Sequence, residues 1–202
     1  TLRRVWERDS ALFLVPLGDR KLLAGAGIGN VEEMDWWQTR RVRGLDVTFL
    51  PAKHWSARGI NDRNLSLWGS WGITGADGTR VYHGGDTGFG PHFAEIGKRW
   101  GAPDLALLPI GAYAPRWFMS DAHMDPHEAV QAFHDMRARK AVGMHFGTFQ
   151  LTSEGRDEPG ALTQKAAEGL AFHVPEVGQA FFAVAPGTGA TPAVKPSGVN
   201  TR

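Results

Sequence analysis

The segment HGGDTGFG, residues 83–90, overlaps the end of an apolar run and places Asp86 in a glycine-rich turn. Small neighbours let the backbone bend tightly at this point, so the carboxylate can approach other groups closely. Taken alone, a GDTG string is typical of an ordinary aspartate-containing turn. Its significance therefore depends on which side chains lie at the ends of the other apolar runs.

Two further segments carry a histidine at the same kind of position. PAKHWSAR, residues 51–58, holds His54, and VGMHFGTF, residues 142–149, holds His145. Each histidine alone is typical of a hydrogen-bonded residue at a sheet rim, but open α/β sheets bind ligands at the edge formed by the strand ends. With Asp86 they supply three metal ligands and leave a further position for water, as a catalytic zinc site requires. The sequence therefore predicts a metallohydrolase.

The composition excludes several functional classes. The chain has 202 residues, and its 22 lysines and arginines against 21 aspartates and glutamates give no electrostatic basis for a nucleic-acid partner. It contains no cysteine, so a metal must be held by histidine and carboxylate side chains. No apolar run of about 18 residues is present, and we expect a cytoplasmic or membrane-peripheral protein. The chain begins at Thr1, so an upstream targeting segment is not visible.

Apolar, β-branched runs alternate with helical stretches, which predicts an α/β fold with a mixed sheet. The expected strands are 12–17, 47–51, 65–73, 81–85, 105–111, 141–146 and 180–185. The expected helices are 2–9, 19–26, 92–100, 127–139 and 160–171. Pro126 favours a helix start at the fourth of these, because proline fits the first turn. Residues 186–202 have too few large apolar groups to offset ordering entropy, so we expect a disordered tail.

His123 lies in the loop before the 127–139 helix and after an aromatic stretch. It is a candidate for proton transfer or substrate contact outside the metal-ligand set. A capping or surface role is equally open for this residue.

The chain is rich in tryptophan, with eight residues of this type, and four of them lie in or beside the candidate site segments: Trp55, Trp68, Trp71 and Trp117. Tryptophan commonly fills cores, because it buries a large area. An apolar wall at a site would instead suit a lipid or acyl substrate. On that interpretation we expect Trp55, Trp117 and Phe118 to contact substrate.

Several strings closely resemble the N-acylphosphatidylethanolamine-hydrolysing phospholipase D branch of the metallo-β-lactamase superfamily. They are PAKHWSAR, LWGSWGI, GGDTGFGPHFAEIGKRWGAPDLALLPIGAYAPRWFM, HMDPHEAV and MHFGTFQLTSE, and the resemblance runs from about Thr1 to about Pro186. It implies an αββα sandwich that holds two zinc ions at one end and delivers a metal-bridging hydroxide to phosphorus.

The resemblance also implies a role for each candidate residue. His54 matches a ligand of the first zinc, Asp86 the carboxylate that bridges both ions, and His145 a ligand of the second zinc. His123 matches a histidine of the family's active-site loop. Asp86 and His123 are therefore the expected catalytic residues.

One family motif is missing. The signature string His-x-His-x-Asp-His, which supplies most of the remaining ligands, is absent, and no His-x-His pair occurs in the 202 residues. In relatives this string lies just upstream of the helix that matches residues 1–9. We therefore expect the chain to be the carboxyl-terminal portion of a longer protein, with residues 1–185 forming the metallo-β-lactamase-fold domain.

The leading interpretation is a zinc-dependent phosphodiesterase in lipid metabolism that acts on N-acylphosphatidylethanolamine-like substrates. The alternatives are a lactonase or other hydrolase of the same superfamily, because the fold does not fix the substrate, and a non-catalytic fragment that binds its missing half. The expected partners are a small-molecule or lipid substrate, a peripheral membrane surface, and either a missing amino-terminal fragment or a second copy in a homo-oligomer.

Overall fold

The structure, a computed structural model, describes residues 1–176 and 178–183. Its helices are α1 (Leu2–Asp9), α2 (Arg20–Gly25), α3 (His92–Arg99), α4 (Arg116–Met119), α5 (Pro126–Asp135) and α6 (Glu158–Ala166). Its strands are β1 (Phe13–Pro16), β2 (Val31–Met34), β3 (Thr39–Val42), β4 (Leu45–Leu50), β5 (Ser70–Thr74), β6 (Arg80–His83), β7 (Leu105–Pro109), β8 (Ala141–Met144) and β9 (Phe172–His173). Among these described residues, no helix is long and apolar enough to cross a bilayer.

The described strands form a mixed sheet of seven, in the order β3-β4-β5-β6-β7-β8-β9, and a separate parallel pair, β1-β2. β3 to β6 pair antiparallel, whereas β6 to β9 pair parallel. β4 is antiparallel to β5, and β5 is antiparallel to β6, so β4 runs in the same direction as β6, β7 and β8. The carboxyl ends of these four strands therefore lie at one edge of the sheet.

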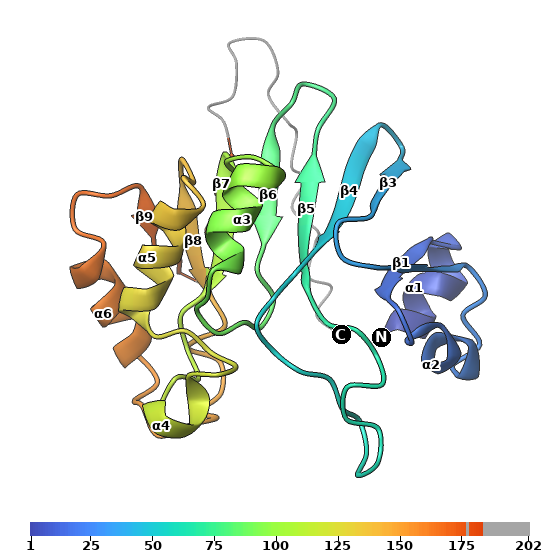
Figure 1. The fold of residues 1–202 in the computed structure, drawn as a ribbon, viewed down its shortest axis with the longest axis horizontal. Coiled ribbons are helices and arrows are strands. Elements are labelled where there is room, and N and C mark those ends of the chain that lie inside the picture. The colour runs from blue at the N-terminus through green and yellow to red at the C-terminus, as the bar shows by residue number, and fades with distance from the viewer. Residues whose placement is uncertain (177, 184–202) are drawn as a thin grey trace, which may run out of the picture.

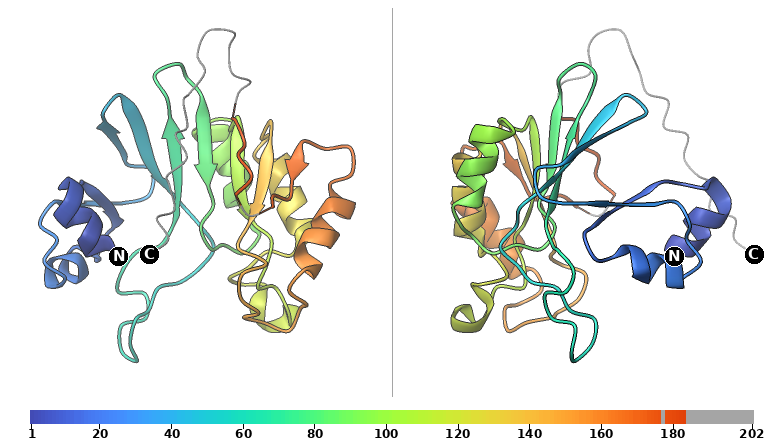
Figure 2. Two further views of the ribbon diagram at one scale, coloured as in Figure 1. Left: turned by 180° about the vertical axis from the view of Figure 1, so that it is seen from behind. Right: turned by 45° about the vertical axis from the view of Figure 1, so that its right-hand side comes forward.

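A layer of helices covers one face of the large sheet. α3, α5 and α6 lie over β6 to β9 (Figure 1), and a view turned by 45° shows them together on one side (Figure 2). Leu108 and Ile110 from the β7 segment and Phe93 and Ile96 from α3 are all fully buried between these layers. Phe93 and Ile96 are three residues apart, so they lie on the same face of α3.

A capping box fixes the start of α5, directly after the loop that carries His123. The Asp125 carboxylate accepts a hydrogen bond from Glu128 N at 2.9 Å, and the Glu128 carboxylate accepts one from Asp125 N at 3.1 Å. This capping box satisfies main-chain groups that the helix itself leaves without partners. α5 begins at Pro126 but ends at Asp135 rather than 139, since Arg137 takes a left-handed φ of 56° that stops the helix.

A second, smaller core lies beyond the β3 edge of the sheet. α1, β1, α2 and β2 pack there, on the side away from α3, α5 and α6 (Figure 2). Its buried residues are Val15, Leu23, Ile28 and Val31, with Trp6 and Phe13 packed against them. Residues 1–34 therefore have their own apolar centre.

The α/β class with a mixed sheet is confirmed, and most expected helices are present, with differences at their ends. β2, β3 and β9 were not expected, because each is short and lacks a clear alternating pattern. The 65–73 segment becomes a strand only from Ser70, and residues 180–183 of the expected last strand are not in a strand. The expected tail at 186–202 lies outside the described residues.

The αββα sandwich expected from the resemblance has two sheets, each with a helical layer. The described residues form one large sheet with its helical layer and the separate β1-β2 pair. The face of the large sheet opposite α3, α5 and α6 has apolar cross-strand pairs, including Phe49 with Trp71 and Val47 with Ile73. The rings of Phe49 and Trp71 lie 4.7 Å apart. This apolar face is the one that a second layer of a sandwich would cover.

Candidate metal centre

Strand direction brings the candidate residues together. His54 follows β4, Asp86 follows β6 and His145 follows β8, and these three strands end at the same edge. His123 reaches this edge from the loop that joins α4 to α5. α4 and the loop between β4 and β5 project beyond this end of the sheet (Figure 1).

The four side chains form one compact cluster. His54, Asp86 and His123 each offer a ligand-capable atom, and these atoms all lie within 4.8 Å of one another. His145 Nε2 lies 3.2 Å from Asp86 Oδ1. The His123 ring stacks on the His145 ring at 5.4 Å and lies edge-on to the His54 ring at 5.5 Å. Three imidazoles therefore surround a single carboxylate.

Each imidazole keeps one buried nitrogen without a hydrogen-bond partner among the described residues: His54 Nε2, His123 Nδ1 and His145 Nδ1. His54 Nδ1 lies 2.9 Å from the carbonyl oxygen of Trp55. Because a carbonyl only accepts, Nδ1 must carry the proton, and this leaves a lone pair on Nε2. Buried polar atoms without partners are costly, and neutral imidazole nitrogens beside a carboxylate are the donors that a divalent transition metal prefers. The residues therefore fit a metal ion.

The carboxylate of Asp86 and the imidazole of His145 each stabilise the charged form of the other. The hydrogen bond from His145 lowers the pKa of Asp86, and the same contact raises the pKa of His145. The pKa of His123, by contrast with that of His145, is lowered, because burial favours the neutral form of the imidazole. Asp86 is therefore the negative centre of the site, with His145 as its hydrogen-bond donor.

Main-chain contacts tie the His54 loop to the Asp86 loop. Gly88 N donates to Lys53 O at 2.8 Å, and Lys53 N donates to Thr87 Oγ1 at 2.9 Å. Gly88 also lets the chain pass close to the next segment, because a Cβ there would lie 2.8 Å from Ser120 O. The Lys53 ammonium donates to that same carbonyl at 3.3 Å. These contacts fix the loops on either side of the cluster.

Arg116 clamps the segment that carries His123. Its guanidinium donates to His123 O at 3.0 Å and to the Glu128 carboxylate at 2.6 Å, and it lies 3.6 Å from the Asp125 carboxylate. His123 N donates to Met119 O at 2.8 Å. The main chain of His123 is thus held at both its donor and its acceptor. The sequence interpretation missed Arg116, because no local pattern indicates a partner seven residues away.

His145 occupies an unusual backbone conformation, with a φ of 62°. Non-glycine residues seldom adopt this left-handed region, and such conformations cluster at functional sites. Gly111, just after β7, lies directly against its main chain, and a Cβ at that position would overlap His145 O. The sequence interpretation also missed Gly111, although a glycine after a buried strand is a recognised sign of close backbone approach.

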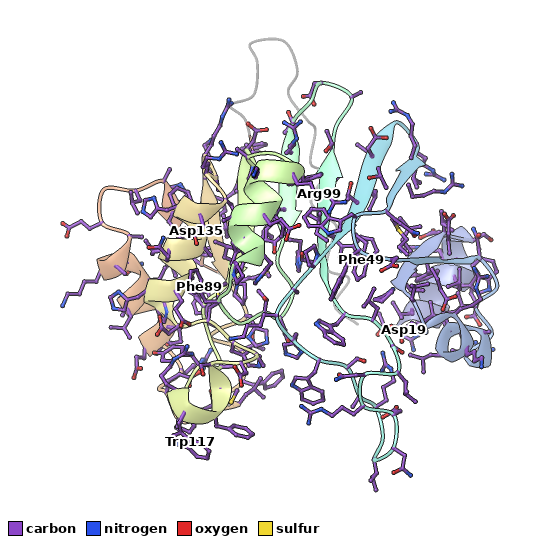
Figure 3. All side chains as sticks on the ribbon, in the orientation of Figure 1. Asp19, Phe49, Phe89, Arg99, Trp117 and Asp135 are labelled. Carbon is purple, nitrogen blue, oxygen red and sulfur yellow. The ribbon has the colours of Figure 1, made fainter. Side chains whose placement is uncertain are left out.

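The expected substrate contacts lie around the cluster rather than in it. The Trp55 ring is stacked with the His54 ring at a centre-to-centre distance of 5.7 Å. The Arg63 guanidinium lies over the Trp55 ring, 5.0 Å from its centre. Trp117 and Phe118 on α4 are 85% and 68% exposed, and Trp117 lies at the tip of the molecule (Figure 3). An open cavity of about 880 Å³ begins at His54 and Trp55 and extends to the start of α2.

The other two tryptophans are structural. Trp68 Nε1 donates to Ala52 O at 3.0 Å, and its ring packs edge-on against Trp36 at 6.1 Å. Trp71 lies on the sheet against Phe49. An apolar wall formed by all four tryptophans is therefore not what the structure shows.

The sequence identifies the family to which this fold and this candidate metal centre belong. The sequence matches the family model described as "Beta-lactamase superfamily domain" over residues 3–146. The chain belongs to this metallo-β-lactamase superfamily, which confirms the expected fold class.

Similar proteins agree with this assignment. The chain is 36% identical, over 85% of its length and 39% of the relative's, to "N-acyl-phosphatidylethanolamine-hydrolyzing phospholipase D, mitochondrial" of Saccharomyces cerevisiae. It is 40% identical, over 73% of its length and 44% of the relative's, to "N-acyl-phosphatidylethanolamine-hydrolyzing phospholipase D 1" of Caenorhabditis elegans. The chain therefore spans about two fifths of the length of these relatives.

A solved structure shows the same fold. Igni18, described as a novel metallo hydrolase from Ignicoccus hospitalis, matches with a TM-score of 0.67 and 25% sequence identity. The match covers 87% of this chain and 70% of Igni18.

Proposed function

We propose that this chain carries metal-binding residues of a zinc-dependent phosphodiesterase of phospholipase D type, which acts on N-acylphosphatidylethanolamine-like lipids. One observation carries the proposal. His54, Asp86, His123 and His145 gather at one sheet edge, in a chain that is 36% and 40% identical to two proteins named for this reaction. The remaining metal ligands would come from an amino-terminal segment or from a second copy.

The residues of the cluster have separable tasks in this proposal. A zinc ion held by these residues would supply Lewis acidity and would lower the pKa of a water bound to it. His54 presents Nε2, because Trp55 O fixes the proton on Nδ1. Asp86 is ionised at neutral pH, since His145 holds its pKa below the ordinary value, so it can neutralise positive charge in the site. Histidine nitrogen and carboxylate oxygen without cysteine form a donor set that suits zinc.

The surroundings of the site favour a lipid substrate. Trp117 and Phe118 project from α4 with most of their surface exposed, at the end of the sheet that carries the cluster. Exposed aromatic rings of this kind are enriched where proteins meet the membrane–water interface. We propose that they contact acyl chains at a peripheral membrane surface, while Trp55 contacts the part of the substrate nearest His54.

The test is a substrate panel on the protein expressed from its complete reading frame. We expect the protein to release N-acylethanolamine and phosphatidic acid from N-acylphosphatidylethanolamine. This activity should be lost on chelation and should return when zinc is added. A lactone panel is run in parallel. Efficient lactone opening without phosphodiester cleavage would overturn the phosphodiesterase and leave the superfamily assignment unchanged.

A further inference from the structure

We infer that Glu154, a buried carboxylate in the loop between β8 and α6, is a positioning residue that holds His123 in place. It acts through residues 110–115, which join β7 to α4. The inference deepens the proposed function and rests on it, because His123 is the residue expected to act on substrate outside the metal-ligand set. The tie between the two segments can nevertheless be measured without substrate.

Both carboxylate oxygens of Glu154 are hydrogen-bonded within the protein. Oε2 accepts from Ala114 N at 3.0 Å, and Oε1 accepts from the Thr152 hydroxyl at 2.6 Å. Carboxylates are seldom buried unless such partners satisfy them. Because both oxygens serve the protein's own donors, Glu154 matches a residue that holds other segments better than one that contacts substrate.

Glu154 carries its negative charge at neutral pH. Burial alone would raise the pKa of this carboxyl group. Hydrogen bonds from the Thr152 hydroxyl and from main-chain N–H groups, among them Ala114 N, outweigh that effect and lower the pKa below its ordinary value. A hydrogen bond to an ionised acceptor is roughly twice as strong as one between neutral groups. The contact at Ala114 is therefore stronger than an ordinary main-chain contact.

Neighbours of Glu154 hold the same connection. Ser153 N donates to Ala114 O at 3.2 Å, so the donor and the acceptor of Ala114 are both held by residues 153–154. The hydroxyl of Tyr113, which is also buried, donates to the Glu158 carboxylate at 2.5 Å. The segment that follows β8 therefore fixes two consecutive residues ahead of α4.

Arg116 extends this tie to His123. Its guanidinium donates to Tyr113 O at 3.4 Å and to His123 O at 3.0 Å. Because Ala114 lies two residues before Arg116, a shift at Ala114 would move the group that holds His123. A misplacement of about 1 Å at a reacting group can reduce the rate about 100-fold. A small movement of Ala114 should therefore lower turnover.

The tie also joins the segments that carry two histidines of the cluster. His145 and Glu154 lie in the same connection, between β8 and α6, whereas His123 lies beyond α4. The rings of His123 and His145 stack at 5.4 Å. The bond from Ala114 to Glu154 therefore helps to fix the spacing of these two rings.

The experiment compares Glu154→Ala and Glu154→Gln in the protein expressed from its complete reading frame. Hydrogen exchange over residues 112–123 measures the tie, elemental analysis measures zinc, and steady-state kinetics gives kcat and KM. For Glu154→Ala we expect faster exchange over 112–123 and a kcat lowered by about 10–100-fold. KM and zinc content should stay unchanged. Glutamine keeps an oxygen that can accept from Ala114 N, so Glu154→Gln should recover most of the lost kcat.

Thr163→Val is the matched control. Thr163 is fully buried, and its hydroxyl donates to Pro159 O at 2.7 Å within α6. Valine has nearly the same shape but cannot donate, so the control loses a buried hydrogen bond away from Ala114. It should lower the melting temperature and leave kcat and the exchange over 112–123 unchanged.

Unchanged exchange over 112–123 in folded Glu154→Ala would overturn the inference. Loss of zinc from this variant, or an equal fall of kcat in Thr163→Val, would overturn it as well. If Glu154→Ala does not fold, Glu154→Asp provides the comparison, because its shorter side chain withdraws the carboxylate from Ala114 N.

The two proposals fail in different measurements. The phosphodiesterase fails when the unaltered protein opens lactones and leaves phosphodiesters intact, and the kinetic comparison is then made with the lactone. The positioning role fails in the exchange of the variant, whichever substrate the unaltered protein cleaves.

Discussion

Asp86 is the single carboxylate at the centre of three imidazoles. Its pKa is lowered by His145, and it shares a 4.8 Å cluster with His54 and His123. Asp86 therefore supplies the negative charge of the cluster, whereas the imidazoles supply neutral nitrogen donors. Substitutions that change this charge test the site more directly than changes to any single histidine.

Asp86→Asn should remove metal binding and leave the fold intact. The amide oxygen can still accept a hydrogen bond from His145, but it lacks the charge that attracts a cation. We expect bound metal to fall to background, with the melting temperature of the metal-free chain changed by only a few degrees. Elemental analysis and circular dichroism measure these quantities.

Asp121→Asn is the control for this change. The Asp121 side chain is 93% exposed and pairs with Lys53 at the surface, so its charge contributes little. The control should bind metal normally. Equal loss of metal in both variants would show that net charge, rather than the cluster, controls binding.

Gly111→Ala should disturb His145 without changing any polar side chain. The added Cβ would overlap His145 O, so the left-handed segment at that residue must move. We expect a loss of about 1–3 kcal/mol in the free energy of unfolding, which is typical of overpacking, and a weaker metal site. Urea unfolding and zinc titration measure the two effects.

Gly155→Ala is the matched control for Gly111→Ala. A Cβ there would be 3.8 Å from the nearest atom, an ordinary contact, and the residue has no left-handed φ. It should leave stability and metal affinity nearly unchanged. A similar loss in both variants would argue against a specific role for the space beside His145.

At the level of elements, the first residue of α3 makes the stability of the fold at acid pH depend on a contact beside the cluster. His92 opens this helix, and its Nε2 lies 3.2 Å from Thr87 Oγ1, which also accepts a hydrogen bond from Lys53 N. Burial, together with the positive charge of Lys53, lowers the pKa of His92 to about 4. Protonation of His92 should therefore weaken the contact through Thr87 that joins the His54 loop to the Asp86 loop.

The sign of the pH effect follows from this shift. The unfolded chain takes up the proton at the ordinary histidine pKa of about 6.5, whereas the folded chain resists it until about pH 4, so acid favours unfolding across this interval. The contribution of His92 is present above about pH 6.5 and is lost toward pH 4, with an upper limit of roughly 3 kcal/mol. Urea unfolding from pH 4 to pH 7 measures it.

His92→Gln isolates this contribution from the other groups that titrate in the same range. Glutamine can keep a hydrogen bond to Thr87 but does not titrate, so the variant should lose less stability than the unaltered chain between pH 6.5 and pH 4. Parallel pH profiles for the two proteins would exclude the proposed role of His92.

The elements also show what the sequence could predict. The positions of His54, Asp86 and His145 after apolar runs indicated a shared edge, and strand direction brings them there. The start of α5 was equally readable, because the effect of Pro126 on the first turn is local.

The remaining features were not readable, because they depend on long-range packing. The contact of Gly111 with His145 joins residues that follow two neighbouring strands, and the clamp of Arg116 on His123 depends on how α4 packs. β3 is mostly exposed, so no burial pattern marks it in the sequence. The metal-ligand roles of the site residues stay predictions.

On the scale of the whole molecule, the chain has two apolar cores of unequal size. The larger lies between the seven-stranded sheet and α3, α5 and α6, whereas the smaller contains Val15, Leu23, Ile28 and Val31. Stability within one protein follows the local extent of buried apolar packing. The smaller core should therefore open more readily than the larger one.

Hydrogen exchange should resolve the two cores. We expect amides of β1 and β2 to exchange through openings of lower free energy than amides of β7 and β8, which lie inside the large sheet. Ile110→Ala should reduce global stability by about 2–5 kcal/mol. Ile28→Ala should mainly increase exchange in residues 11–34 and leave metal binding unchanged.

The opposite pattern would contradict this division. If Ile28→Ala lowered protection in β7 and β8 as strongly as Ile110→Ala, the two cores would unfold as one cooperative unit. Exchange measured by mass spectrometry on both variants distinguishes the two cases.

The tie between Lys53 and Gly88 has a consequence for evolvability. Gly88 N and Lys53 O are main-chain atoms, and Trp55 O, which orients His54, is another. Main-chain donors and acceptors remain when the side chain of the same residue is replaced, unless the replacement is proline. The loop at 57–65 can therefore accumulate mutations while the histidine behind it keeps its orientation. A library randomised over those positions would vary the surroundings of the cluster while His54 keeps its orientation.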